Sequence, residues 1–275
     1  MRAALRRRDS TPYDLAPVAT HLLCPLSFEA RILSKGLRGT THLPGATVVG
    51  PGLGPKTFIE RHGASGDIAI LVGTAGAIRT PYPPAAWLAR VESSDHAGGG
   101  VWRSPLLERV LGANGAKGGA EGGAAAGGLT VSGVVRTPAE KAALAQRHPD
   151  ATLIDLESWG FAETCHHRGV QWLVLRGVSD GPNDTLPVDV ADWVTPRGST
   201  RLRGVLSALI REPQQLPAMR ELGVRSTRAM LAVAELLGGA AEAIAQLAGR
   251  TEGPREHDDV PLRLDQLPSI GGEDD

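Results

Sequence analysis

Apolar and polar positions follow two periods along the body of the chain, one typical of strands and one typical of helices. Apolar runs of strand length occupy 21–26, 46–50, 67–73, 129–135, 151–157 and 171–180. The run at 67–73 is almost continuously apolar, which is expected of a strand buried on both faces. Helical patterns fill the intervals, beginning at Phe28 and covering 158–168, 201–211 and 225–248. This alternation predicts an α/β fold with three layers, α/β/α, around a central, largely parallel mixed sheet.

One helix start is marked by four consecutive residues. Thr137 can serve as the N-cap, Pro138 occupies the first helical position, and Glu140 stands three residues after the cap. This is the pattern of a capping box with proline at the first position. We therefore expect a helix to begin at 138.

Glycine and alanine dominate 98–128, so this range is expected to be a flexible surface insertion with little to bury. The charged and polar ends predict two further flexible segments, an N-terminal tail at 1–16 and an acidic C-terminal tail at 251–275. The remaining body, 17–250, is predicted to be a single domain.

Composition excludes several classes of protein. The 275 residues carry 29 Lys+Arg against 30 Asp+Glu, a formal net charge of −1, so no nucleic-acid partner is expected. No run of eighteen apolar residues predicts a membrane span, and 225–248 is expected to be a packing helix. No apolar segment of the signal-peptide kind follows the basic N-terminus, and there are only two cysteines, so a cytoplasmic location is expected.

Acidic residues gather at the ends of two neighbouring predicted strands. Asp155 and Glu157 end one strand, and Ser179 and Asp180 end the next. Open α/β sheets bind ligands at the carboxyl edge, where these side chains would meet. Two carboxylates there can divide their roles, one ionised and gripping hydroxyls, the other protonated and acting as a general acid. Taken singly, each is an ordinary strand-end or turn residue; their coincidence is what predicts a site.

Four short motifs in order carry a resemblance to a known family. They are Leu26-Ser27-Phe28-Glu29, Gly52-Leu53-Gly54, Gly73-Thr74-Ala75-Gly76, and the pair Asp155-Leu156-Glu157-Ser158 with Arg176-Gly177-Val178-Ser179-Asp180. Together they resemble the family-1 purine nucleoside phosphorylases and nucleosidases, and among these the methylthioadenosine/adenosylhomocysteine nucleosidases. The segment 193–213 is longer than in the compact members and is similar to the hopanoid-associated branch, whose members remove adenine from an adenosyl-lipid. The chain departs from the family after Gly76, where Ile78-Arg79-Thr80-Pro81 replaces a Gly-Asp strand.

The resemblance implies a role for each matching residue. Asp180 would protonate the leaving purine, and Glu29 would act as the general base that orients the attacking water. Glu157 would accept hydrogen bonds from the ribose hydroxyls. The other substrate contacts implied are Asp155, Leu156, Thr74, Ala75, Gly76, Val134, Val135 and Ser179.

Those roles fit the chemistry of N-glycosidic cleavage. The sugar passes through a cationic, oxocarbenium-like state, and the base leaves more readily when it is protonated. The predicted activity is an N-ribosyl hydrolase acting on an adenine or related purine nucleoside with a 5′-substituent. The resemblance further implies a homodimer that needs no cofactor and no metal. Cys165-His166-His167 is accordingly expected to be a set of surface and half-buried side chains.

Two alternatives stay open at this point. One is a phosphate-dependent phosphorylase, although Leu71 stands where such members have an arginine and a buried phosphate without a cation is costly. Arg31 or Arg79 could substitute for that cation. The other is a nucleoside-binding protein that has lost activity.

Overall fold

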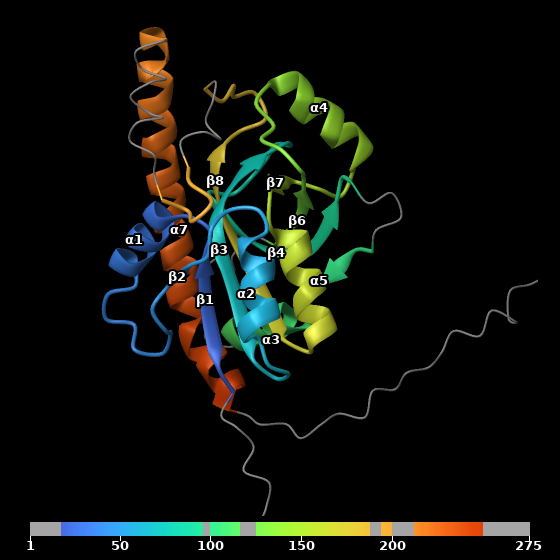
Figure 1. Cartoon of the computed structure of the whole chain (residues 1–275), viewed down its shortest axis with the longest axis vertical. Helices are drawn as coiled ribbons and strands as arrows, with labels where there is room; N and C mark the ends of the chain where they lie inside the picture. Colours follow the sequence, from blue (N-terminus) through green and yellow to red (C-terminus); the bar gives the residue numbers. More distant parts are fainter. Residues whose placement is uncertain (1–17, 96–99, 116–124, 188–193, 200–211, 250–275) are drawn as a thin grey trace, which may run out of the picture.

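The computed structural model describes residues 18–95, 100–115, 125–187, 194–199 and 212–249 (Figure 1). Its strands are β1 (Thr20–Cys24), β2 (Thr47–Val48), β3 (Ile68–Ala77), β4 (Ala85–Ser93), β5 (Trp102–Arg103), β6 (Ala125–Thr130), β7 (Leu153–Asp155) and β8 (Gln171–Asp180). Its helices are α1 (Ser27–Gly36), α2 (Gly54–His62), α3 (Pro105–Gly115), α4 (Pro138–Arg147), α5 (Ser158–Arg168) and α7 (Leu216–Gly249), the last preceded by the 3-10 helix η2 (Pro213–Gln215). An α/β fold with a mixed sheet is therefore confirmed.

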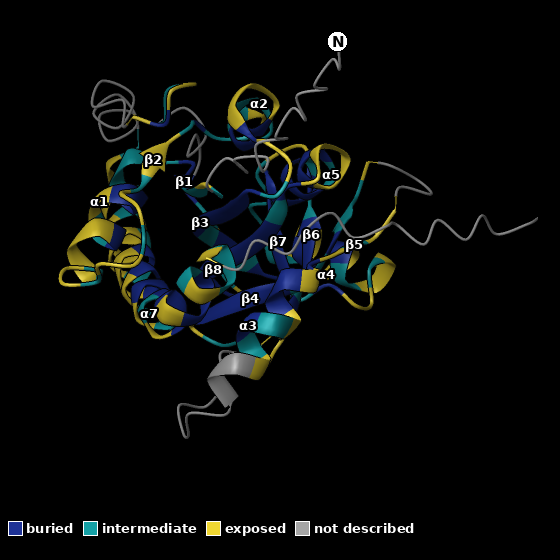
Figure 2. Ribbon diagram, turned by 90° about the horizontal axis from the view of Figure 1, so that it is seen from below, coloured by how far each residue is buried: buried dark blue, intermediate teal, exposed yellow. Residues whose placement is uncertain are grey.

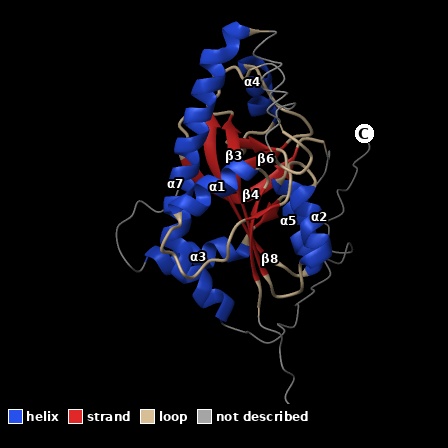
Figure 3. Cartoon of the chain, turned by 60° about the vertical axis from the view of Figure 1, so that its left-hand side comes forward, coloured by secondary structure: helices blue, strands red, loops and turns tan. Residues whose placement is uncertain are grey.

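The layering differs from the prediction because the sheet closes on itself. The ten-residue strand β8 pairs in parallel with β3 and antiparallel with β4, while β3, β7, β6 and β4 follow one another along the same sheet. Five strands thus form a ring, with β1 and β2 extending it beyond β3 and β5 beyond β4. Helices α1, α3 and α7 lie on one side of it, and α2 and α5 on the other (Figure 3). Long strands that can pair on both edges favour closure, which a local pattern of alternation does not reveal.

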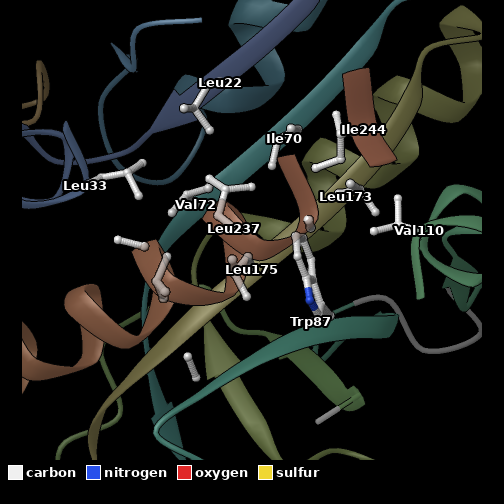
Figure 4. Close-up of a cluster of buried hydrophobic side chains, with 14 of the residues drawn as sticks. Leu22, Leu33, Ile70, Val72, Trp87, Val110, Leu173, Leu175, Leu237 and Ile244 are labelled. Carbon is white, nitrogen blue, oxygen red and sulfur yellow. The ribbon is translucent and has the colours of Figure 1, made fainter. Parts of the chain in front are cut away.

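Helix α7 lies against β8 over the larger of the hydrophobic clusters (Figure 4). Leu237 and Ile244 of this helix belong to the same buried cluster as Ile70, Leu173 and Trp87. The helix comes so close that a side chain on Gly177 of β8 would lie 2.7 Å from the carbonyl oxygen of Ala229. The prediction of a packing helix over 225–248 is therefore confirmed.

By length and composition alone, the stretch Pro213–Gly249 would be long and apolar enough to cross a membrane. Ten of the α7 side chains are buried within the protein, and Figure 2 shows this burial along its inner face. Burial of this kind is typical of the core helix of a globular domain.

The range 98–128 is not simply a surface insertion. Residues within it form β5, α3 and the start of β6, and Leu106 and Val110 of α3 are buried. Gly127 lies so close to the backbone of Asp150 that a Cβ would come within 2.0 Å of its carbonyl oxygen. Some of these glycines are therefore required by close packing, which composition alone cannot distinguish from flexibility.

Other element predictions are partly right. Thr137 and Glu140 form the expected capping box at the start of α4. Strand β6 begins earlier than the predicted 129–135, and neither β4 nor α2 was predicted. The tails at 1–16 and 251–275 and the helix predicted over 201–211 lie outside the described residues.

Candidate active site

A cavity of about 830 Å³ opens at the edge where β3, β7 and β8 end. The start of α1 and the first turns of α7 complete its wall. Every residue predicted for the site lines this one cavity, namely Glu29, Thr74, Ala75, Gly76, Val134, Val135, Asp155, Leu156, Glu157, Ser179 and Asp180. Side chains from five separate segments therefore meet in one place, at the carboxyl edge of the parallel pair β3–β8.

Glu29 stands in the first turn of α1 with only 2 % of its surface exposed. Its Oε1 accepts hydrogen bonds from the backbone N–H of Thr74 at 2.8 Å and from the Thr74 hydroxyl at 2.9 Å. Its Oε2 accepts from the N–H of Leu26 at 3.1 Å. Burial raises the pKa of Glu29 to about 7, against the opposing effects of the Thr74 hydrogen bonds and the charge of Arg176. A carboxylate with a pKa near neutrality is suited to general-base catalysis.

Arg176 of β8 lies fully buried among three carboxylates. Its Nε donates to Asp155 Oδ2 at 2.8 Å and its Nη2 to Glu157 Oε2 at 3.1 Å. Burial alone would lower the pKa of Arg176, but the charges of Asp155, Glu157 and Glu29 raise it overall. We call these four side chains the arginine cluster. Three acids against one guanidinium give it an excess of negative charge.

Asp155 holds this cluster together. Its Oδ1 accepts from the Thr130 hydroxyl and from the backbone N–H groups of Glu157 and Ser158. Its Oδ2 accepts from Arg176 and from the Ser158 hydroxyl. With five protein donors the carboxylate has little capacity left for a substrate, so its geometry is that of a residue that orients Arg176 and the start of α5.

Glu157 keeps more of its capacity. Its Oε1 accepts from the backbone N–H of Gly52 at 3.0 Å, and its Oε2 accepts from Arg176. Gly52 adopts a positive φ of 65°, which lets the turn before α2 present this N–H. Burial raises the pKa of Glu157; the charge of Arg176 opposes this shift and that of Asp155 adds to it. The lone pairs that remain free can accept from hydroxyl groups.

Asp180 at the end of β8 has a different partner. Its Oδ2 accepts from Lys141 Nζ of α4 at 2.6 Å, and its Oδ1 accepts from the Ser179 hydroxyl at 2.6 Å. The Lys141 side chain is fully buried and Asp180 is 6 % exposed. We call Lys141 and Asp180 the lysine pair.

Two glycines of β3 form the floor beneath these groups. A Cβ on Gly73 would lie 2.5 Å from Arg176 Nη1 and 3.2 Å from Glu29 Oε1. A Cβ on Gly76 would lie 2.9 Å from Asp180 Oδ2. The register pairs Gly73 with Arg176 and Gly76 with Asp180, with a bulge after Ala75. The Gly-Thr-Ala-Gly motif therefore leaves the space that the charged groups of β8 and α1 occupy.

One donor in the arginine cluster is free. Arg176 Nη1 is buried and, among the described residues, has no hydrogen-bond partner. It lies over Gly73 together with both carboxylate oxygens of Glu29.

Sequence reasoning missed several residues of this site. The motif from Arg176 to Asp180 assigns no role to Arg176, although an arginine inside an apolar strand is itself a signal, because buried arginines need acidic partners. Lys141 gave no signal, since a lysine on an amphipathic helix is ordinarily exposed. The first turns of α7, including Met219 and Leu222, also line the cavity and were not predicted.

The cations considered for phosphate are not placed to hold it deep in the site. Leu71 is buried in the core. Arg79 donates to the backbone carbonyls of Ala145, His148 and Ala151, and Arg31 lies exposed at the rim. Within the described ranges no group of three metal-ligating side chains comes together, and His166 stacks on Trp102.

Comparison with known proteins finds a family model that matches part of the chain. Residues 128–211 match the model of the phosphorylase superfamily. A search of curated proteins by sequence finds no match. Residues 128–211 include Asp155, Glu157, Arg176 and Asp180, so the sequence match covers both acidic strand ends.

Solved structures share the fold at low sequence identity. Futalosine hydrolase of Helicobacter pylori aligns with a TM-score of 0.57 and 13 % identity, covering 82 % of this chain and 97 % of that one. The 5′-methylthioadenosine/S-adenosylhomocysteine nucleosidase from Neisseria meningitidis, in complex with methylthio-immucillin-A, aligns with a TM-score of 0.54 and 13 % identity, covering 84 % and 98 %. S-adenosylhomocysteine nucleosidase from Streptococcus pyogenes, in complex with 5-methylthiotubericidin, aligns with a TM-score of 0.51 and 14 % identity, covering 82 % of this chain and 99 % of that one. Residues 128–211 thus match the phosphorylase superfamily in sequence, and most of the chain has a fold similar to that of solved nucleosidases.

Proposed function

We propose that this enzyme is an N-ribosyl hydrolase that cleaves the N-glycosidic bond of an adenine or related purine nucleoside carrying a 5′-substituent. The observation that carries the proposal is the meeting of Glu29, Glu157 and Asp180 around one cavity. A base, a hydroxyl acceptor and an acid are the three groups that this cleavage requires. The nucleosidases that share the fold support the substrate class.

In this proposal each acid has one task. Glu29, with its pKa near 7, takes a proton from the attacking water. Glu157 accepts from the ribose hydroxyls, and the negative charge of the arginine cluster stabilises the cationic sugar. Asp180 with Ser179 faces the purine and delivers a proton to it. Thr74, Ala75, Gly76, Leu156, Val134 and Val135 shape the surrounding pocket.

Water is the nucleophile that this charge distribution favours over phosphate. A phosphate dianion beside Arg176 would also face Glu29, Asp155 and Glu157, whose combined charge exceeds that of the guanidinium. Burying an anion against excess like charge is costly. The favoured reaction is hydrolysis.

The 5′-substituent lies in this proposal toward α1 and the first turns of α7. Phe28, Ile32, Met219 and Leu222 make that part of the cavity wall apolar. The cavity volume falls in the range of small-molecule sites. We further propose a homodimer, supported by the exposed apolar side chains of Leu216, Val224 and Leu231 on α7, and a cytoplasmic location, supported by two free, buried cysteines.

The direct test is incubation with adenosine, 5′-methylthioadenosine and other 5′-substituted adenosines, following free purine by chromatography with and without phosphate. Phosphate-independent release of purine and free sugar supports the proposal. A requirement for phosphate with formation of ribose 1-phosphate would make it a phosphorylase. Calorimetric binding without any release would make it an inactive nucleoside-binding protein. Size-exclusion chromatography with light scattering tests the dimer.

A further inference from the structure

Lys141 is buried at the back of the proposed site without a function assigned to it. It lies one turn into α4, and its side chain has no exposed surface. Its Nζ donates to Asp180 Oδ2 at 2.6 Å, to the carbonyl oxygen of Gly181 at 2.6 Å and to that of Asp184 at 3.2 Å. An ammonium has three N–H donors, and all three are used here. The geometry is therefore that of a charged lysine.

The Lys141 ammonium forms its ion pair with the carboxylate of Asp180. The Asp184 carboxylate points elsewhere, accepting from the Gly181 N–H and from Arg225 of α7. The Tyr82 hydroxyl faces Gly181, since a Cβ there would come within 2.5 Å of it. Asp180 and Asp184 thus lie next to Lys141, with Arg225 beyond Asp184 and Tyr82 beyond Gly181.

This arrangement bears on how Asp180 can act as an acid at neutral pH. Aspartic acid in water ionises near pH 4 (about 3.9), so a general acid of this type needs a source of protons. Both Asp180 oxygens already accept from fixed donors, Lys141 on Oδ2 and Ser179 on Oδ1. Of these two donors, the ammonium is the one that can release a proton readily.

We propose that Lys141 is the positioning residue that loads Asp180 with the proton delivered to the purine; this inference rests on the proposed hydrolase function. As the bond between the sugar C1′ and the purine nitrogen breaks, its electron pair stays on the purine. Lys141 Nζ gives a proton to Asp180 Oδ2, and the purine nitrogen takes a proton from the carboxyl group so formed. The water oxygen bonds to C1′ and gives its proton to Glu29. Solvent then reprotonates the neutral Lys141 amine and removes the proton from Glu29, so the sum is nucleoside plus water giving purine plus ribose.

The test compares two leaving groups in Lys141→Met and Lys141→Arg. A purine needs a proton to leave, whereas p-nitrophenolate leaves without one. In Lys141→Met the release of adenine from adenosine or 5′-methylthioadenosine should fall by ~10²-fold or more, because the acid is no longer loaded. Hydrolysis of p-nitrophenyl β-D-riboside should change by less than about threefold, because that step needs no acid.

Lys141→Arg separates proton supply from charge. Arginine keeps the positive charge but does not give up its proton in proteins. We expect it to lose purine release selectively, as Lys141→Met does. Equal loss on both leaving groups, or full purine release in Lys141→Arg, would overturn the proposal in favour of a structural or purely electrostatic role. Lys56→Met is the matched control, a half-exposed lysine paired with Glu163, and should leave both rates unchanged.

A third measurement needs no variant. As the pH rises from about 7 to about 9, the wild-type rate of purine release should stay level, because the ammonium of Lys141 supplies Asp180 with a proton that an isolated aspartic acid would have lost. A purine-release rate that falls as the pH rises just above neutrality, where Glu29 is already ionised, would contradict proton loading. This profile also decides the matter if the variants do not fold or the nitrophenyl riboside is not cleaved. If the wild type releases no purine from any substrate, the proposed function fails, an outcome distinct from all of these.

Discussion

Two buried cations, Arg176 and Lys141, lie at the same edge of the sheet, but in different surroundings. Arg176 lies among three carboxylates, Glu29, Asp155 and Glu157, whereas Lys141 faces the single carboxylate of Asp180 and two backbone carbonyls. The arginine cluster therefore carries excess negative charge, and the lysine pair is balanced. Excess negative charge suits the half of the cavity proposed to face a cationic sugar and a water. A balanced pair suits the half proposed to pass a proton to the base.

The difference also predicts how each half responds to losing a charge. In a balanced buried pair, removing one member leaves the other wholly uncompensated. In a cluster with surplus acids, removing one acid still leaves the cation partnered. The cation of the cluster is the exception, because all three acids depend on it.

The largest effect is expected from Arg176→Met. It leaves three buried carboxylates facing one another without a counter-ion, which should cost about 5 kcal/mol of unfolding free energy and abolish purine release. Urea unfolding followed by circular dichroism measures the loss. Arg147→Met, an exposed arginine on α4, is the control and should change stability by less than about 0.5 kcal/mol. A stable Arg176→Met protein would show that the cluster does not depend on its cation.

Neutralising one acid in each half tests the comparison directly. Asp180→Asn leaves Lys141 buried without a counter-ion, so it should lose about 3–5 kcal/mol of stability as well as ~10²–10⁴-fold in kcat. Glu157→Gln leaves Arg176 paired with Asp155, so it should lose only about 1–2 kcal/mol of stability. Its kcat/KM should fall by about 10–100-fold through weaker hydrogen bonds to the sugar. Equal destabilisation of the two variants would contradict the difference in charge balance.

The sequence predicted the contents of the cavity better than the connections that stabilise it. Strand-end acids are local features: Asp155 ends β7 and Asp180 ends β8, as the alternation predicts, whereas Glu157 lies two residues beyond β7 as the N-cap of α5. The closure of the sheet depends on β8 pairing with two strands more than 80 residues earlier in the chain, at Ala85–Trp87 and Ile68–Gly76. No local pattern encodes such long-range pairing.

The burial of Lys141 and the packing of the Gly/Ala-rich range could not be predicted for a related reason. Whether a lysine is buried depends on a partner 39 residues away in sequence, here Asp180. Whether Gly127 is flexible or tightly packed depends on the backbone of Asp150, which lies against it. Residue type indicates the possible roles, and only the tertiary neighbours select one of them.

A smaller effect is expected from the protonation of Glu29, the proposed general base, as the pH changes. Glu29 has a pKa of about 7 in the folded enzyme, above its ordinary value of 4.5, so the folded state binds its proton more tightly than the unfolded chain does. The stability due to this protonation is complete below about pH 4.5 and is lost as pH rises through about 7. Purine release should show the opposite trend, rising about tenfold per pH unit below 7 as Glu29 ionises.

Glu29→Gln sharpens that prediction. It should flatten the rise of kcat with pH and make the change of Tm between pH 5 and about pH 8 shallower. Tm is measured by calorimetry across the same buffers as the rates. A rate that is independent of pH in the wild type from about 5 to 8 would remove Glu29 from the role of base.

The smallest effect is expected from Thr137→Ala, which weakens the helix that carries Lys141. The Thr137 hydroxyl accepts from the Glu140 N–H at 3.2 Å and caps α4 one turn before Lys141. Removing the cap should cost about 1 kcal/mol and lower Tm by a few degrees. Because Lys141 Nζ is still fixed by three acceptors at the far end of its side chain, kcat should stay within about twofold of the wild type. A loss of kcat at unchanged Tm would mean that α4 moves during the reaction, and that the lysine pair is held by the helix more than by the acceptors around its ammonium.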